Sequence, residues 1–295
     1  MTPFEKCARD LIASRGAEGT RELYTIDLDR WLVFCAEREI NVEYPTPSQA
    51  AVFRDTLAST RKSATVRRTL AALSRMYRAA VNAWPQAAKW NPFDADTLAR
   101  PPASDFAKTE ALAHDETLAI MAYAVTDKHY GVRDTAILRL LYDTGLRISA
   151  VVTLRREKIF RRGDVTLARV RTKNKDEVDV ELTTESVTAL DRWLAIAPVS
   201  PFVFPAPKNT KLALSRLVFY KRLRKYGDAV QASRVHPHRF RTTYITDALD
   251  AEIPLNKVQA SVHHASPVMT QRYDRGKRGT GVAAALAAAR AKRNT

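Results

Sequence analysis

Cysteines, apolar runs and familiar enzyme motifs are all scarce in this 295-residue chain. Its two cysteines, Cys7 and Cys35, show no CxxC or metal-binding spacing, which excludes a disulfide framework and weakly indicates a reducing compartment. The first residues lack the apolar run of a signal peptide, and no stretch approaches the ~20 apolar residues that span a bilayer. We therefore expect a cytoplasmic protein without a membrane segment.

The signatures of nucleotide, hydrolase and metal sites are missing as well. The chain contains no GxSxG, GxGxxG or HExxH pattern and no phosphate-binding P-loop. It also lacks an acidic cluster of the kind that holds two metal ions in nucleases. These absences argue against a nucleotide-driven or metal-dependent enzyme, and we expect no cofactor.

Acidic residues are few beside basic ones, 32 Asp and Glu against 48 Lys and Arg, for a net charge of +16. Residues 51–100 carry a net +6 and residues 201–295 a net +13, whereas residues 1–50 carry −3 and residues 101–200 carry none. The 45% share of hydrophobic residues can fill a core, which excludes a disordered basic tail. Two basic blocks favour a protein that grips nucleic acid from two sides. Solvated surface lysines are the plainer alternative.

Hydrophobic periodicity predicts a mainly α-helical protein of two domains. A helical domain is expected at 1–100, a linker rich in Pro and small residues at 101–109, and an α-rich domain with a small β-sheet at 110–295. Alternating runs at 165–171 and 177–182 flank a polar turn and predict a β-hairpin. Helices are predicted over 20–40, from Pro47 to about Leu57, over 64–84, from His114, and over 132–142, 184–196, 210–226, 240–250, 254–262, 267–273 and 281–291.

Residues 64–84 form the clearest amphipathic helix. Its large apolar side chains share one face, and the opposite face carries four arginines: Arg67, Arg68, Arg75 and Arg78. The helix carries no acidic residue, so we expect these arginines to contact a nucleic-acid backbone. An ordinary surface helix has the same pattern and remains the alternative.

The second half of the chain contains groups that could act on a phosphodiester. Without a metal, such chemistry needs arginines to neutralise the phosphate, a nucleophile, and a proton donor for the leaving alkoxide. Four sequence pieces supply them: Leu140-Leu-Tyr-Asp-Thr-Gly-Leu-Arg-Ile-Ser149, Thr172-Lys-Asn-Lys-Asp176, His236-Pro-His-Arg-Phe-Arg-Thr-Thr-Tyr244, and Val262-His-His-Ala-Ser266 with Met269-Thr-Gln-Arg-Tyr273.

The order Arg, Lys, HxxR, His, Tyr resembles the tyrosine recombinases, also called the phage integrase family. The string that ends in Arg147-Ile-Ser149 is similar to the first arginine motif of that family, and the nine-residue step from His264 to Tyr273 fits its second motif. The resemblance covers nearly the whole chain. It implies that residues 1–100 are a core-binding (SAM-like) domain and that the rest is the catalytic domain.

The resemblance also implies site-specific DNA recombination that needs neither metal nor ATP. Tyr273 would attack the scissile phosphate, form a 3′-phosphotyrosyl link and release a 5′-hydroxyl. Arg147 and Arg241 would clamp the non-bridging oxygens, because a guanidinium stays charged and bonds two oxygens at once. Lys173 would protonate the leaving oxygen, with Lys175 as the alternative. A DNA-binding protein without catalysis and a topoisomerase-like enzyme are the competing functions.

The HxxR motif fits in two registers, His236 with Arg239 and His238 with Arg241. We prefer His238 with Arg241, because Thr242-Thr-Tyr-Ile-Thr continues as the family helix does after its arginine. Thr242 itself departs from the family, in which histidine is common at this place. Arg239 would then contact the DNA backbone or lie on the surface.

The last histidine of the set is expected to be His264. It precedes the small residues Ala265-Ser266, as the family pattern requires, whereas His263 occupies a place where the family often has glycine. His238 and His264 would assist by proton transfer and phosphate hydrogen bonding. A second departure is Ala150, where family members often carry glutamate, so a local ion pair is expected to be missing.

The resemblance finally implies partners. Family members work as tetramers on two DNA duplexes, and each protomer passes its C-terminal segment to a neighbour. Residues 276–295, with an Ala-rich run at 281–291, would be that segment, and a frayed tail is the alternative. The chain begins almost directly with the core-binding helices. We therefore expect a Xer-like homotetramer without an arm-binding domain, acting on a double-stranded core site with inverted repeats.

Overall fold

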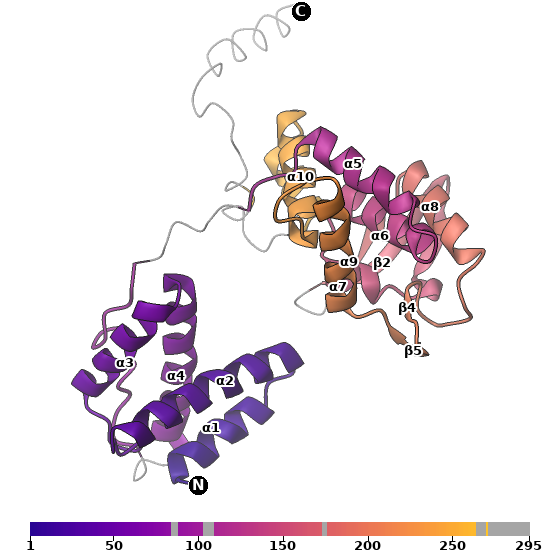
Figure 1. Ribbon diagram of the computed structural model, residues 1–295. Helices are drawn as coiled ribbons and strands as arrows, with labels where there is room; N and C mark the ends of the chain where they lie inside the picture. The colour runs from indigo at the N-terminus through magenta and orange to yellow at the C-terminus, as the bar shows by residue number, and fades with distance from the viewer. Residues whose placement is uncertain (84–87, 103–108, 173–175, 264–269, 271–295) are drawn as a thin grey trace, which may run out of the picture. The chain divides into compact units, whose positions relative to one another are not determined.

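The computed structural model describes residues 1–83, 88–102, 109–172, 176–263 and 270, and the chain divides into two compact units, Met1–Lys108 and Thr109–Thr295 (Figure 1). Helices dominate both units, and the described strands form small antiparallel sheets in the second unit. The predicted fold class, mainly α with a small sheet, is confirmed. The functions assigned to residues 1–100 and 110–295 stay predictions.

The first unit is built from four described helices: α1 (Pro3–Ala13), α2 (Glu18–Glu37), α3 (Pro47–Thr60) and α4 (Ser63–Ala83). Helix α4 contacts the other three. The predicted start of α3 is confirmed, because the Thr46 side chain accepts a hydrogen bond from the Gln49 N–H and the Gln49 side chain accepts one from the Thr46 N–H. Helix α1 was not predicted, although the Thr2 side chain caps it by accepting a hydrogen bond from the Glu5 N–H.

Aromatic side chains from distant parts of the sequence form the core of the first unit. Phe4 of α1 stacks on Tyr77 of α4 with ring centroids 4.0 Å apart. Trp31 of α2 donates a hydrogen bond of 2.8 Å to the Tyr77 hydroxyl, which donates in turn to the Val42 carbonyl at 2.6 Å. Because the polar atoms of these buried rings are paired, they stabilise the unit without the cost of an unsatisfied group.

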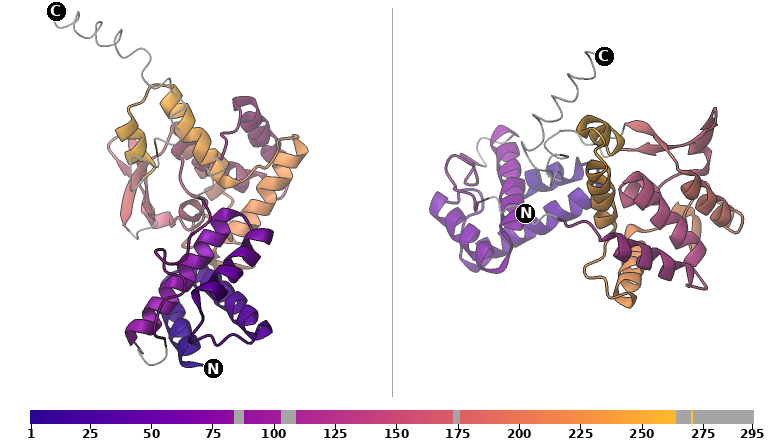
Figure 2. Two further views of the ribbon diagram at one scale, coloured as in Figure 1. Left: turned by 90° about the vertical axis from the view of Figure 1, so that its left-hand side faces the viewer. Right: turned by 90° about the horizontal axis from the view of Figure 1, so that it is seen from above.

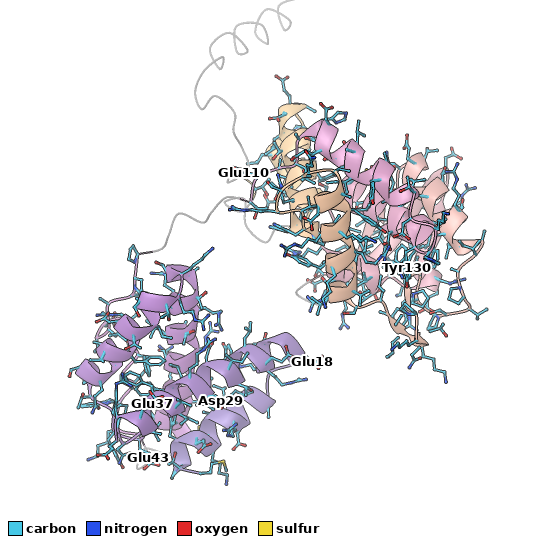
Figure 3. The ribbon with its side chains drawn as sticks, viewed as in Figure 1. Glu18, Asp29, Glu37, Glu43, Glu110 and Tyr130 are labelled. Atoms are coloured by element: carbon cyan, nitrogen blue, oxygen red, sulfur yellow. The ribbon has the colours of Figure 1, made fainter. Side chains whose placement is uncertain are left out.

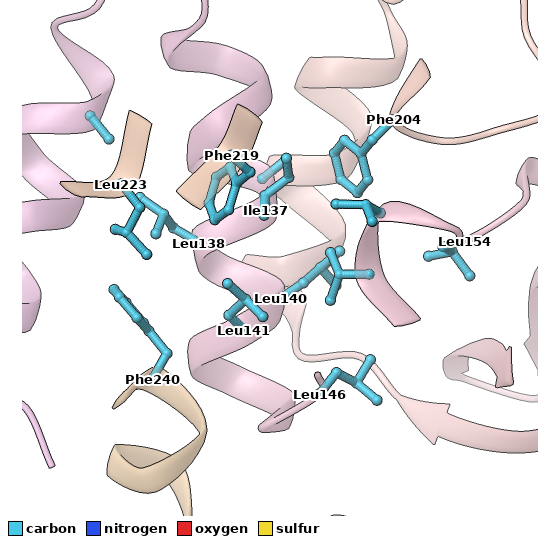
Figure 4. Packing of buried hydrophobic residues seen from close by; sticks show 14 of the residues in the cluster. Ile137, Leu138, Leu140, Leu141, Leu146, Leu154, Phe204, Phe219, Leu223 and Phe240 are labelled. Carbon is cyan, nitrogen blue, oxygen red and sulfur yellow. The ribbon is translucent and has the colours of Figure 1, made fainter. Parts of the chain in front are cut away.

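Helix α6 (Gly131–Thr144) lies at the centre of the second unit, in contact with α5 (His114–Val125), α7 (Ile148–Val152), α8 (Thr184–Leu194) and α10 (Pro237–Asp250). Figure 4 shows Leu138 and Leu141 of α6 near Phe240 of α10 and Leu223 of α9 (Arg216–Ala229). The other described helices of this unit are α11 (Leu255–Ser261) and the 3₁₀ turn Arg156–Lys158.

Strands β1 (Ile159–Arg162), β2 (Val165–Arg171) and β3 (Glu177–Glu181) form an antiparallel sheet along one side of the second unit (Figure 2). Pairing of Arg171 with Glu177 closes the predicted hairpin, which is confirmed; β1 was not predicted. The hairpin therefore brings Thr172, after β2, beside Asp176, before β3.

The helix predicted over 210–226 is wrong in its first turn. Strand β5 (Asn209–Ala213) pairs with β4 (Pro205–Ala206), and the Leu214 N–H donates to the Phe204 carbonyl at 2.8 Å. These strand pairings use the backbone that the helix would have needed, so α9 begins only after Ser215. Tertiary pairing outweighs the local helix preference here.

Candidate active site

A cavity of about 300 Å³ in the second unit gathers side chains from the arginine string, the hairpin, the HxxR piece and the residues after α11. Its charged and titratable lining residues are Arg147, Arg171, Arg216, Arg241 and His263. None of the described lining residues is acidic. Four guanidinium groups around one small cavity make a site for a tetrahedral anion such as phosphate.

Arg147 reaches this cavity from a sharp turn between α6 and α7. Gly145 ends α6 in the left-handed conformation, with φ +61°, and its N–H donates to the Leu141 carbonyl at 3.1 Å. A Cβ at this position would lie 2.5 Å from the Cδ1 atom of Tyr244, so only glycine fits. Within the described residues, the half-buried Arg147 side chain has no hydrogen-bond or ion-pair partner, which leaves its guanidinium available to a ligand.

Arg241 is a buried residue in the lining of the cavity. Its side chain is 2% exposed on α10; its Nη1 donates to the Gly145 carbonyl at 2.7 Å and its Nη2 to the Val262 carbonyl at 2.6 Å. One guanidinium thus joins α10, the turn that carries Arg147, and the end of α11. This arrangement fixes the cationic wall of the cavity before any ligand binds, and such preorganisation makes electrostatic catalysis effective.

His238 lies on the first turn of α10 and is solvent-exposed as a whole residue. Partial burial of its ring lowers its pKa, and the charges of Arg241, His236 and Arg147 lower it further. The pKa of His236 is also lowered, by burial and by Arg239. The charges of both cavity arginines thus act on His238, although His238 does not line the cavity. The preferred HxxR register, His238 with Arg241, stays a prediction.

Arg239, the arginine of the other register, lies in different surroundings. Its Nε donates to the Glu110 carbonyl and its Nη2 to the Ala111 carbonyl, both at 3.0 Å, and its Nη1 donates to the Ser233 carbonyl. Glu110 marks the start of the second unit in Figure 3. The guanidinium holds residues 110 and 111 against α10. The sequence predicted a DNA-backbone contact or a surface position for Arg239 and did not indicate this structural role.

In the first unit, Arg68 also has an unpredicted partner. It makes a two-pronged ion pair with Asp27 of α2, one contact being 3.0 Å, and Asp27 is fully buried. Thr69 donates to the same carboxylate at 2.9 Å. The sequence prediction considered acidic residues only within α4 itself and so overlooked Asp27 of α2 as a partner of Arg68. The signal was available, because Asp27 lies among Tyr24, Leu28 and Trp31 on the apolar face of its helix.

The other arginines of α4 differ in how strongly they are bound by neighbouring groups of the protein. Arg67 donates to the Pro101 carbonyl at 2.7 Å, and Arg75 donates to the Tyr24 hydroxyl at 2.6 Å. Arg78 makes only a 3.6 Å contact with Asp94, and its side chain is 65% exposed. Arg78 is therefore the member of the predicted DNA-binding face that is most open to a partner, and DNA contact by all four stays a prediction.

Several predicted groups lie outside the described residues: Lys173, Lys175, His264, Tyr273, most of the linker and the segment 276–295. The structure describes their flanks. The Thr172 N–H donates to the Asp176 carbonyl at 2.8 Å across the hairpin turn, and Thr172 lines the cavity. Ala150, the departure from the family glutamate, also lines it.

Three charged or titratable cavity residues were not among the predicted site residues: Arg171, Arg216 and His263. Arg171 is the last residue of β2, directly before the turn with the predicted lysine, so its place in the hairpin was a usable signal. Arg216 begins α9, a boundary that was predicted incorrectly. His263 was considered and set aside in favour of its neighbour.

Among the described residues, no helix is long and apolar enough to cross a membrane. The same part of the chain holds no group of three or more His, Cys, Asp or Glu residues that could hold a metal ion.

Residues 110–278 match the model of the phage integrase family. The match covers more than half of the chain, and together with the arginine-lined cavity it shows that the chain belongs to this family.

Curated relatives are tyrosine recombinases. XerC of Leptospira interrogans is 30% identical over 148 residues, which cover 48% of this chain and 46% of that protein. XerC of Pseudomonas fluorescens is 25% identical over 260 residues, which cover 86% of this chain and 84% of the relative. The chain spans about half the length of the first curated relatives that it matches, 46% in one and 57% in another.

Solved structures with the same fold include DNA complexes. The XerH site-specific recombinase, in a post-cleavage complex with palindromic difH substrate, gives a TM-score of 0.75 at 16% identity, covering 90% of this chain and 79% of that one. A lambda integrase dimer bound to a COC′ core site gives 0.71 at 18% identity, covering 94% and 77%. At these identities the likeness shows the fold alone.

Proposed function

We propose that this chain is a site-specific DNA recombinase that cuts and rejoins strands through a covalent bond to Tyr273. The observation that carries the proposal is the cavity in which Arg147 and Arg241, 94 residues apart in sequence, line one space with no acidic neighbour among the described lining residues. Family membership and the recombinase relatives support it. The site suits a phosphate that gains charge during the reaction.

The chemistry follows from the roles of the side chains. The Tyr273 oxygen forms a bond to phosphorus while the bond from phosphorus to the 5′ oxygen breaks, and Lys173 gives its proton to that leaving oxygen. Arg147 and Arg241 bond the non-bridging oxygens and stabilise the extra negative charge of the transition state. Attack by a 5′-hydroxyl on the phosphotyrosine reverses each of these steps, so the strand is rejoined with no net change in the number of bonds.

His238 would accept a proton in the cleavage step. Its pKa is lowered by partial burial and by the cavity arginines, so the imidazole is unprotonated near neutral pH and can take the proton of the attacking hydroxyl. His264 would add a phosphate hydrogen bond, as predicted from the family pattern.

The partners belong to the same proposal. We infer a double-stranded core site with inverted repeats, a homotetramer in the recombining complex, exchange of residues 276–295 between protomers, and a cytoplasmic location. Arg78 would contact the DNA backbone from the first unit, because its side chain is 65% exposed and its contact with Asp94 is long, at 3.6 Å.

A nicked suicide substrate tests the cleavage step, because the short strand beyond the nick diffuses away and traps the covalent complex. The wild-type protein should yield a protein–DNA adduct that survives denaturing electrophoresis, and Tyr273→Phe should yield none. Tyr123→Phe is the matched control, since this tyrosine of α5 lies away from the cavity lining and a phenylalanine keeps its ring contact with Tyr226.

Three outcomes would contradict the proposal. An adduct with Tyr273→Phe equal to that of wild type would show that another group is the nucleophile. Tight site binding by the wild-type protein without any adduct would indicate a non-catalytic DNA-binding protein. Relaxation of every supercoiled plasmid, with no need for a site, would indicate a topoisomerase.

A further inference from the structure

His263 holds an unusual backbone conformation at the edge of the cavity. Helix α11 ends at Ser261, and His263 follows with φ +52°, its N–H donating to the Ala260 carbonyl at 3.1 Å. Glycine is the usual residue at such a helix end, because a side chain makes the left-handed region costly. Other non-glycine residues of the described chain, including Glu39 and Gln231, also have positive φ. Conformation alone therefore does not distinguish His263, but its surroundings do.

The imidazole of His263 lines the same cavity as Arg147 and Arg241. The residue before it is fixed to that site, because Arg241 Nη2 donates to the Val262 carbonyl at 2.6 Å. Arg241 therefore joins the backbone beside His263 to the turn that carries Arg147. The backbone next to His263 is therefore held in place relative to the two arginines.

The Nε2 atom of His263 is buried and has no hydrogen-bond partner among the described residues. Buried polar atoms are nearly always paired, because an unpaired one loses its bonds to water and gains nothing in return. His263 is half-buried and lines a cavity that also holds four arginines, so an anion bound in that cavity is a partner that would satisfy Nε2.

The charge state of His263 fits such a role. Burial of the ring lowers its pKa, and the charges of Arg241 and Arg147 lower it further. Two other guanidinium groups line the cavity, those of Arg171 on β2 and Arg216 on α9. The imidazole is therefore neutral near pH 7, and a neutral imidazole carries one N–H donor. A phosphate oxygen accepts that hydrogen bond when the proton is on Nε2.

We propose that His263 is a further phosphate-binding residue of the site, one that donates a hydrogen bond from Nε2 to a non-bridging oxygen of the DNA phosphate held by Arg147 and Arg241. The inference rests on the proposed recombinase function and adds a group at a position where the family often has glycine. His263 would thus act beside His264.

The direct test is His263→Gly in a single-turnover cleavage assay on the nicked suicide substrate. Glycine removes the imidazole and suits the left-handed backbone, so the thermal unfolding midpoint should equal or exceed that of wild type. The cleavage rate should fall about 10- to 100-fold, the usual worth of a hydrogen bond to a charged group. Affinity for the DNA site should stay within about two-fold, because many other phosphate contacts hold the duplex.

His263→Asn sharpens the test, since asparagine tolerates a left-handed backbone and keeps an N–H donor. It should recover part of the rate lost in His263→Gly. His129→Asn, which changes an exposed histidine of the turn between α5 and α6, is the control for the loss of an imidazole elsewhere and should cleave at the wild-type rate.

A substrate with a methylphosphonate at the scissile position identifies the oxygen. In one stereoisomer the methyl group replaces the oxygen that His263 binds, and on that isomer His263→Gly should cost little. On the other isomer it should cost as much as on the natural phosphate. Equal costs on both isomers would overturn the assignment.

The remaining outcomes separate the two proposals. If the wild-type protein forms no adduct, the recombinase function fails and this inference falls with it. If the wild-type protein forms the adduct and His263→Gly cleaves at the same rate, the role of His263 alone is overturned. A rate for His263→Asn no higher than that of His263→Gly would also overturn it.

Discussion

Arginines in the two units of the molecule differ in what occupies them. On α4 of the first unit, Arg68 is bound by the fully buried carboxylate of Asp27. In the cavity of the second unit, Arg147 has no partner within the described residues, although it is half-buried. A guanidinium that already has a carboxylate contributes to stability, and one that lacks a partner in a cationic cavity is available to an anion. The comparison therefore separates arginines that the protein itself pairs from those left open to a ligand, and a functional role for the latter stays a proposal.

The largest expected effect is on the cleavage rate and concerns Arg147, the arginine without a partner in the described part of the chain. Arg147→Ala should lower the single-turnover cleavage rate by about 100- to 1000-fold, the typical loss when one preorganised donor to a developing charge is removed. Because Arg147 has no partner in the described protein, the free energy of unfolding should change by less than about 0.5 kcal/mol.

Urea denaturation beside the cleavage assay checks both halves of this prediction. Arg161→Ala, an exposed arginine of β1 that does not line the cavity, is the matched control. A large loss of stability in Arg147→Ala would place this residue among the structural arginines and break the comparison.

Arg68→Met should have the opposite signature. It removes the main partner of a fully buried carboxylate, and the free energy of unfolding of the first unit should fall by about 2–3 kcal/mol. Thr69, and Arg30 at 3.5 Å, remain beside Asp27, which keeps the loss below that of a wholly unpaired charge.

Hydrogen exchange of the α2 and α4 amides reports the first unit by itself and measures this loss. Arg78→Met is the control on the same helix, because Arg78 is mostly exposed and should cost less than about 0.5 kcal/mol. Equal stability of Arg68→Met and wild type would mean that the pair with Asp27 does not stabilise the first unit. Arg68 would then no longer count as a structural arginine.

A third, smaller effect concerns Arg239. Arg239→Ala removes hydrogen bonds to the Glu110, Ala111 and Ser233 carbonyls, which lie near enough to the surface to bind water instead. The free energy of unfolding should fall by about 1–2 kcal/mol.

The salt dependence of DNA binding decides whether Arg239 also contacts DNA. Loss of one phosphate contact lowers the slope of log affinity against log salt by ~0.9. We expect that change for Arg78→Ala and no change for Arg239→Ala. A lower slope for Arg239→Ala would restore the DNA contact predicted from the sequence.

The parts of the fold that the sequence predicted depend on neighbours in sequence. Helix α4 follows from its 3.6-residue periodicity, the start of α3 from Thr46-Pro47 with Gln49, and the hairpin from alternation around a polar turn. The parts that were missed depend on remote partners. Pairing with β4 converts residues 209–213 from a predicted helix into a strand, and no local pattern reveals that pairing.

The same limit holds at the site. Arg147 and Arg241 were predicted because their motifs are short and specific, and the structure brings both to one cavity. Arg216 was missed because its place in the cavity depends on how α9 packs. The burial of Asp27 could have been read from its place on the apolar face of α2, but its pairing with Arg68, 41 residues away, could not. A sequence motif identifies a reactive group more readily than it identifies the groups that surround it.

The smallest effect extends the comparison to pH. Asp127, in the turn between α5 and α6, accepts hydrogen bonds from the His129 and Tyr130 N–H groups at 3.1 and 2.9 Å and from Arg222 at 2.7 Å. Arg222 also lies over the Tyr130 ring, which Figure 3 labels. Burial raises the pKa of Asp127, but these hydrogen bonds outweigh burial and hold the pKa well below its usual range.

A carboxyl group whose pKa is lower in the folded state stabilises the protein above its unfolded pKa of about 4, and this contribution is lost as pH falls through the folded value. Asp127→Asn should therefore lower the free energy of unfolding at pH 7, and its difference from wild type should shrink at pH 3. Urea denaturation at both values measures the change, with Asp164→Asn in the exposed turn between β1 and β2 as the control. If the difference in the free energy of unfolding stays constant with pH, Arg222 and the turn bind the neutral side chain as well as the charged one. Packing and neutral hydrogen bonds, rather than the charge of Asp127, would then hold Arg222 in place.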